Sequence, residues 1–180
     1  MDVRSFRFGA SLPLAGSSRS DWRARLREVE DLGYDILRVP DHLGMAAPFP
    51  ALAAAADVTG IRLGTYVLNG GLLSPAYLAR DVAGTYRLTD GRLELGLGAG
   101  YVPDEFTAAG LPFGTPGSRL RKLEEVLTGM RKLLAAGPDA PRPPIIADTL
   151  LRYREECGIS YISILQDHMR TFAEVIPLLR

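Results

Sequence analysis

Apolar and polar residues along the chain follow two alternating periods, which predict short strands that each lead into a helix. Alternating or continuous apolar runs at 7–14, 35–40, 61–69 and 92–100 predict four buried strands. Helical spacing follows each run, and the longest helix, near 118–136, carries one apolar stripe of Leu120, Leu123, Leu127, Met130 and Leu134. This order is typical of βαβ units and a parallel sheet.

Two more short strands are predicted at 144–147 and 159–165, with a helix between them that begins at Asp148 and a last helix after them. A complete (β/α)₈ barrel has eight strands and typically about 250 residues. The chain has 180 residues and about six predicted strands. The expected fold class is therefore α/β, an incomplete TIM-type barrel with about six parallel strands, in a single domain over residues 1–180.

Composition excludes several classes of partner and of site. Lys plus Arg equals Asp plus Glu at 21 each, so no net charge recruits nucleic acid or a membrane surface. There is no apolar run near 18 residues and no signal-peptide core, which predicts a cytoplasmic protein. The single cysteine, Cys157, excludes an internal disulfide and is expected to be a small packed residue. No His or Glu cluster has metal-ligand spacing, so no metal site is predicted.

Polar residues follow the second and third predicted strands at their carboxyl ends. Asp41 and His42 come directly after the second strand, and Asn69 ends the third. Barrel enzymes place their active sites at this end of the strands, and histidine can exchange a proton near neutral pH. Two alternatives stay open: Asp41 caps the next helix while His42 fills a loop, and Asn69 with the two glycines after it forms only a tight turn.

The glycine-rich segment GLGAGY at 96–101 ends the fourth strand. A dinucleotide-binding interpretation fails because Pro103 follows and no helix opens directly from the glycines. One interpretation is that Gly98, Ala99 and Gly100 line the floor of the barrel mouth and Tyr101 forms a wall. The other is that the glycines relieve crowding inside a curved sheet.

Two further polar residues are better explained by structure than by catalysis. Glu94 interrupts an apolar strand, and a buried carboxylate needs a partner, for which Arg92 and Arg119 are candidates. His168 follows the last predicted strand, and a ligand contact is the less favoured of its two interpretations.

Several segments together resemble the bacterial luciferase-like monooxygenase family, whose members use reduced flavin or the related deazaflavin coenzyme in a TIM-type barrel. The resemblance rests on the order and spacing of DHL (41–43), TYVLN (65–69), TDGRLELGLGAGY (89–101), DEF (104–106), SRLRKLEEVLTGMRKLL (118–134) and GISYISI (158–164). It implies that the family's sixth and seventh strands are absent, as in a barrel with an internal deletion. It also implies a cis peptide in the third strand.

The same resemblance implies a site. His42 would act on the reacting adduct or substrate, while the cofactor-binding residues would be Asp41, Asn69, Gly98, Ala99, Gly100 and Tyr101. The cofactor would be FMN or the deazaflavin coenzyme. Because the family holds the phosphate tail with the later part of its barrel, we expect the ring site to be kept and the tail site to be lost. Losing two charge-assisted hydrogen bonds of roughly 1.5–3 kcal/mol each would weaken binding by about 10²–10⁴-fold.

The expected function is that of a luciferase-like oxidoreductase with monooxygenase or hydride-transfer chemistry. The alternatives are a non-catalytic dimeric protein that binds a flavin-like ligand and a structural partner subunit. The alanine-rich run at 52–57 and the small residues of 76–84 lie on the second and third predicted helices, through which family members dimerise. A homodimer through these helices is therefore expected, although small residues also suit helix–sheet packing. No feature identifies a second substrate.

Overall fold

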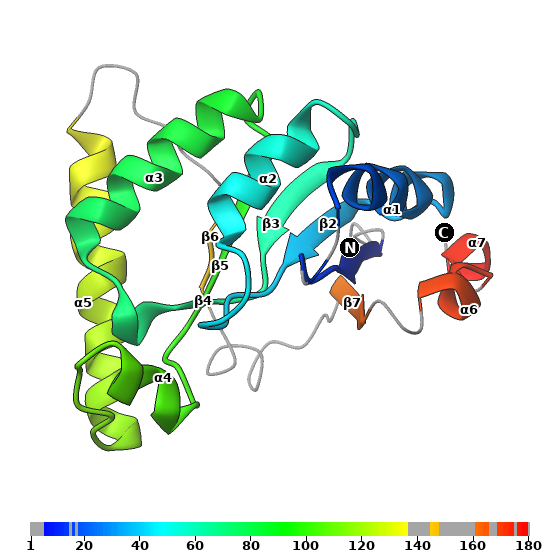
Figure 1. Ribbon diagram of the computed structural model, residues 1–180. Coiled ribbons are helices and arrows are strands. Elements are labelled where there is room, and N and C mark those ends of the chain that lie inside the picture. The colour runs from blue at the N-terminus through cyan, green and yellow to red at the C-terminus, as the bar shows by residue number, and fades with distance from the viewer. Residues whose placement is uncertain are drawn as a thin grey trace, which may run out of the picture.

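The computed structural model describes residues 6–14, 16, 18–136, 145–147, 161–165, 169–174 and 176–179. Strands and helices alternate over most of the chain, as the apolar pattern predicts (Figure 1). The elements are β1 (Arg7–Ser11), α1 (Arg19–Asp31), β2 (Ile36–Val39), α2 (Pro48–Ala56), β3 (Arg62–Thr65), β4 (Leu68–Asn69), the 3₁₀ turn η1 (Gly70–Leu72), α3 (Pro75–Leu88), β5 (Leu93–Gly98), α4 (Pro103–Ala108), α5 (Pro116–Ala135), β6 (Ile145–Ala147), β7 (Tyr161–Leu165), α6 (Met169–Ala173) and α7 (Ile176–Leu179).

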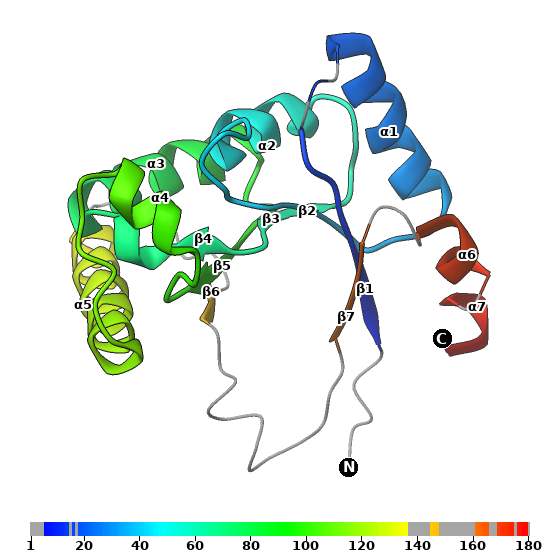
Figure 2. The same cartoon turned by 60° about the horizontal axis from the view of Figure 1, so that its bottom comes forward.

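The described strands form one curved, parallel sheet of seven strands. The order runs β4-β5-β3-β2-β1-β7, and β6 pairs with β5. Figure 2 shows β6 and β7 at opposite ends of the curved sheet. β7 lies beside β1, the position that the last strand of a closed barrel takes. The predicted incomplete TIM-type barrel is therefore confirmed.

The strand count differs from the predicted six because the run at 61–69 forms two strands. β3 ends at Thr65 and β4 begins at Leu68, and the peptide bond between Tyr66 and Val67 is cis, as the resemblance implies for this strand. β5 pairs with β3 near its start and with β4 near its end. The helix predicted from Asp148 and the residues Cys157 and His168 lie outside the described residues.

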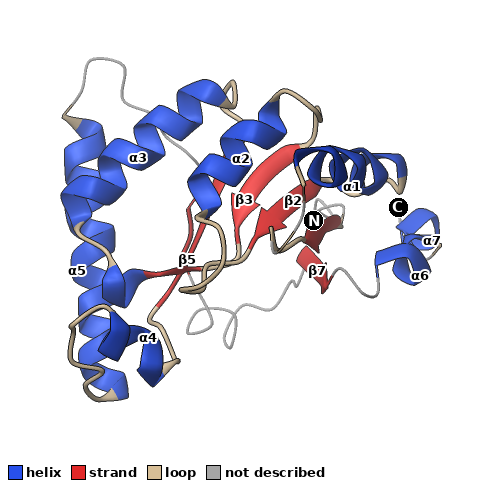
Figure 3. Cartoon of the chain, in the orientation of Figure 1, coloured by secondary structure: helices blue, strands red, loops and turns tan. Residues whose placement is uncertain are grey.

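Helices cover one side of the curved sheet (Figure 3), and apolar side chains of the strands and of these helices form the core. Residues at alternate strand positions point to this side and are buried, as a period of two requires. They include Phe8 and Ala10 of β1, Leu12 just after it, Leu37 and Val39 of β2, and Leu93, Leu95 and Leu97 of β5. α5 packs against α3, and among the described residues no helix is long and apolar enough to span a membrane.

Glu94 belongs to a polar group at the amino ends of the strands, which we call the amino-end cluster: Arg7, Arg62 and Glu94. One carboxylate oxygen of Glu94, which is only 2% exposed, accepts hydrogen bonds from both guanidinium groups. The predicted partners were wrong. Arg92 donates to the backbone carbonyls of Ala56, Thr59 and Ile61, and Arg119 lies near the opposite end of β5.

Candidate functional site

Four polar side chains meet where β2, β4 and β5 end, and we call them the carboxyl-end cluster: Asp41, His42, Asn69 and Glu105. The Nδ1 atom of His42 lies 2.7 Å from Oε1 of Glu105, and Nδ2 of Asn69 donates to Oε2 at 3.2 Å. Glu105 is buried, whereas a third of the His42 side chain is exposed. The cluster thus couples a buried carboxylate to an imidazole that reaches the surface.

Asp41 connects the end of β2 to β4. Its carboxylate accepts a hydrogen bond from the backbone N–H of Asn69 at 3.0 Å. Burial raises the pKa of Asp41 above its ordinary value and the charge of Glu105 adds to this, while the Asn69 N–H and His42 oppose it. The alternative that Asp41 caps the next helix is wrong, because α2 begins after Ala47 and has no side-chain cap.

Glu105 was missed as a site residue by the sequence reasoning, although it lies within the DEF segment. It belongs to α4, a helix of six residues that is too short to show an apolar period. Its neighbour Asp104 is exposed, whereas Glu105 turns inward toward His42, which lies 63 residues earlier in the chain. Only the fold joins the two, so the available sequence signal was the DEF segment itself.

The glycines of β5 and its following loop make room for neighbouring protein atoms. A Cβ at Gly98 would lie 2.8 Å from a methyl group of Val67. Gly100 has a φ of +77°, and a Cβ there would collide with the side-chain amide of Asn69. This arrangement favours the interpretation that the glycines relieve crowding. A direct ligand contact by Gly98, Ala99 or Gly100 stays a prediction.

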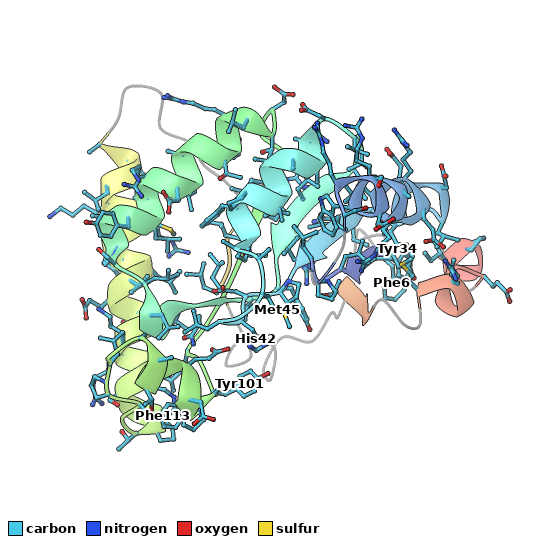
Figure 4. All side chains as sticks on the ribbon, in the orientation of Figure 1. Phe6, Tyr34, His42, Met45, Tyr101 and Phe113 are labelled. Atoms are coloured by element: carbon cyan, nitrogen blue, oxygen red, sulfur yellow. The ribbon has the colours of Figure 1, made fainter. Side chains whose placement is uncertain are left out.

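Exposed apolar side chains lie on the segments that directly follow β2, β3 and β5, and we call them the mouth patch: Leu43, Met45, Tyr66, Val67 and Tyr101. Tyr101 is 75% exposed, and its ring stands edge-on to His42 with 6.1 Å between the ring centres. Figure 4 shows His42, Met45 and Tyr101 close together. Exposed apolar residues that gather beside a polar cluster are typical of a ligand site. Exposed apolar residues that are scattered singly are, by contrast, normal on a protein surface.

Two arginines near the mouth are held by protein groups. Arg38 is buried, and its guanidinium lies 5.0 Å from the ring centre of Tyr66. Arg119 donates to the carbonyls of Gly100 and Gly114 at 3.0 and 3.3 Å. Both guanidinium groups thus have contacts within the protein, whereas the mouth patch offers exposed apolar side chains of the kind that suit a planar ring. Within the residues that the structure describes, no group of three or more His, Cys, Asp or Glu residues is placed to hold a metal ion.

Comparison with known proteins decides the family. The family model for luciferase-like monooxygenases matches residues 3–143, which is more than half of the chain. This chain belongs to the luciferase-like monooxygenase family. An uncharacterised relative from Mycobacterium tuberculosis, Rv0953c, is 39% identical over 87 residues, which cover 48% of this chain and 30% of that protein.

Solved structures of family members share the fold. Monooxygenase RslO1 from Streptomyces bottropensis has a TM-score of 0.66 at 24% identity, over 79% of this chain and 53% of that one. The oxygenating constituent of 3,6-diketocamphane monooxygenase from Pseudomonas putida, in complex with FMN, has a TM-score of 0.62 at 21% identity. The match covers 75% of this chain and 41% of that one. The coenzyme F420-dependent tetrahydromethanopterin reductase from Methanopyrus kandleri has a TM-score of 0.61 at 24% identity. The match covers 75% of this chain and 42% of that one. The matched region thus spans about half or less of each solved relative.

Proposed function

We propose that the chain is a flavin- or deazaflavin-dependent oxidoreductase that binds the cofactor ring at the mouth patch and uses His42 as its acid–base group. The observation that carries the proposal is the His42–Glu105 hydrogen bond. It lies at the carboxyl ends of the strands, at the same end of the sheet as the exposed apolar side chains of the mouth patch. Barrel enzymes place their chemistry at this end.

The pairing with Glu105 defines the role of each imidazole nitrogen. An ionised carboxylate only accepts hydrogen bonds, so Glu105 holds the proton on Nδ1 and leaves Nε2 for a ligand. A reduced flavin or deazaflavin, when bound, supplies hydride or activates oxygen. His42 would exchange a proton at the reacting group through Nε2, and Glu105 would stabilise the imidazolium that results.

The mouth patch would hold the ring, and Asp41, Asn69 and Tyr101 would shape its border. An aromatic pair contributes about 0.5–1.5 kcal/mol beyond the area it buries, and Tyr66 and Tyr101 both present exposed rings. Arg38 and Arg119 are occupied by contacts within the protein, so the described mouth contributes little to a phosphate anchor. Binding would therefore rest mainly on the ring portion of FMN or of the deazaflavin coenzyme.

A non-catalytic protein that binds the same ring is the second candidate. It is supported by the span of the chain, because its structural match covers only about half or less of the solved relatives. In either case we propose a homodimer through α2 and α3. Tyr77 and Leu88 on α3 are exposed large apolar residues, and Ala76 and Gly84 add exposed small ones that allow close helix approach.

The test is calorimetric titration of the purified protein with FMN, with the deazaflavin coenzyme and with the phosphate-free core of each, in both redox states. Similar affinity for a cofactor and its phosphate-free core supports a ring-centred site. Turnover by the complex, lost in His42→Ala without loss of thermal stability, supports the enzyme. Binding without turnover favours the second candidate, and no binding of any ligand contradicts both.

A further inference from the structure

Arg119 lies beside the candidate site but contributes to neither of its two groups of side chains. It is in the first turn of α5, and its side chain reaches back to the loop that follows β5. Its Nε donates to the carbonyl of Gly100 at 3.0 Å and its Nη1 to the carbonyl of Gly114 at 3.3 Å. Its guanidinium also lies 4.0 Å from the ring centre of Phe113.

A second set of contacts joins Phe113 to Phe106, at the other end of the segment that begins at Gly100. The Phe113 ring stands edge-on to Phe106, with 5.2 Å between the ring centres. Phe106 is buried and directly follows Glu105 in α4. Arg119 and the ring it stacks on therefore hold residues 100–106 at both ends. Tyr101 and Glu105 lie between these two points.

α5 is a firm support for such contacts. It has 20 residues, begins with a capping box between Thr115 and Ser118, and packs against α3. Gly100 also lies close to the Asn69 side chain, which itself donates to Glu105. The Gly100 backbone is thus in contact with both Arg119 and Asn69.

We propose that Arg119 is a positioning residue that fixes segment 100–106 so that Glu105 reaches His42 and Tyr101 borders the mouth. The 2.7 Å hydrogen bond between His42 and Glu105 is lost if the segment moves by about 1 Å. Lysine cannot replace Arg119 fully, because a single ammonium group lacks the planar fork and the stacking surface. The effect on catalysis rests on the proposed function, whereas the effect on the His42–Glu105 bond does not.

The test uses nuclear magnetic resonance on the ligand-free protein. The chain has two histidines, so His42→Ala assigns both imidazoles. The nitrogen shifts of His42 should report an Nδ1–H tautomer in the wild type and a mixture of tautomers in Arg119→Met, with Arg119→Lys in between. Arg121→Met is the matched control, since Arg121 is exposed on the same helix and should leave the shifts unchanged.

Thermal unfolding separates positioning from a general loss of structure. If Arg119→Met fails to fold, Arg119→Lys alone decides, by the same shifts. Wild-type shifts in a folded Arg119 variant, or a mixture of tautomers already in the wild type, would overturn the inference. Where the wild type binds a ring core, Arg119→Met should bind it about tenfold more weakly. Failure of every ligand to bind the wild type would count against the proposed function and leave the tautomer result to decide the role of Arg119.

Discussion

The sheet carries a buried glutamate near each end, and the two have different partners. Glu94, in the amino-end cluster, accepts from Arg7 and Arg62 on one oxygen, and its other oxygen is buried without a hydrogen bond. Glu105, in the carboxyl-end cluster, uses both oxygens, one toward His42 and one toward Asn69. Both carboxylates are buried, so burial alone does not separate a structural group from a chemical one.

The partners make the difference. Arginine stays charged in proteins, so Arg7 and Arg62 cannot exchange protons with a substrate and instead neutralise the buried carboxylate. Histidine changes charge near neutral pH, and His42 opens onto the mouth patch, where a ligand can lie against it. The difference in partners supports the proposal that the amino ends of the strands serve stability and their carboxyl ends serve chemistry, the division found in barrels of this type.

The largest effect on stability is expected at the amino end. Glu94→Ala removes the shared acceptor of two guanidinium groups, and hydrogen bonds between charged groups contribute about 1.5–3 kcal/mol each, or about 3–6 kcal/mol for the two. Because the Arg7 and Arg62 side chains are 40% and 36% exposed, we expect a loss of about 3 kcal/mol, the lower end. Urea unfolding measures it. A folded, equally stable variant that no longer binds the ring would reverse the assignment of the two ends.

A smaller loss is expected for Gly100→Ala, which tests the packing behind the carboxyl-end cluster. Gly100 and Gly110 both have a positive φ, but only at Gly100 would a Cβ meet another group, the amide of Asn69. Overpacking costs about 1–3 kcal/mol. Gly100→Ala should therefore be less stable than the Gly110→Ala control by about 1 kcal/mol, the lower end of this range. Equal losses in urea unfolding would show that Asn69 does not restrain this loop.

Asp41→Asn should change how stability depends on pH. The pKa of Asp41 is raised in the folded protein. The contribution of Asp41 to the stability of the wild type is therefore fully present in acid and is lost as the pH rises through this folded-state pKa. Asparagine can still accept the Asn69 N–H without carrying a charge. The variant should therefore match or exceed the wild type at neutral pH, with its advantage shrinking in acid. Thermal unfolding between pH 4 and 8 checks this, and an advantage that grows in acid would contradict it.

Tyr101→Ala should have the smallest effect on stability, less than about 0.5 kcal/mol, because the side chain is 75% exposed. Binding of a ring core should nevertheless weaken by about 2–10-fold, since one aromatic contact is lost. Leu120→Ala is the control, as Leu120 is also exposed but lies on α5 outside the mouth patch. Equal titration results for the two variants would remove Tyr101 from the site.

The strand–helix order and the carboxyl-end position of Asp41, His42 and Asn69 could be predicted because both follow from local patterns. The break at Tyr66–Val67 could not be predicted from local patterns, since the run 61–69 reads as one continuous strand, and only the family resemblance implied the cis peptide there. Nor could the partners of Glu94, which lie 87 and 32 residues away, or the partner of His42, which lies 63 residues away. Arginines are abundant, and choosing Arg7 and Arg62 over Arg92 requires the register of the sheet.

The most direct test of the account compares the two ends of the sheet in one titration. The phosphate-free flavin and deazaflavin cores would be titrated into the wild type, His42→Ala and Arg62→Ala, with the thermal stability and absorbance spectrum of each recorded. We predict that His42→Ala keeps its stability but binds the ring about tenfold more weakly or with a shifted spectrum, whereas Arg62→Ala loses stability and keeps ring affinity. Unchanged affinity and spectrum in His42→Ala, or a loss of binding confined to Arg62→Ala, would contradict the placement of chemistry at the carboxyl ends.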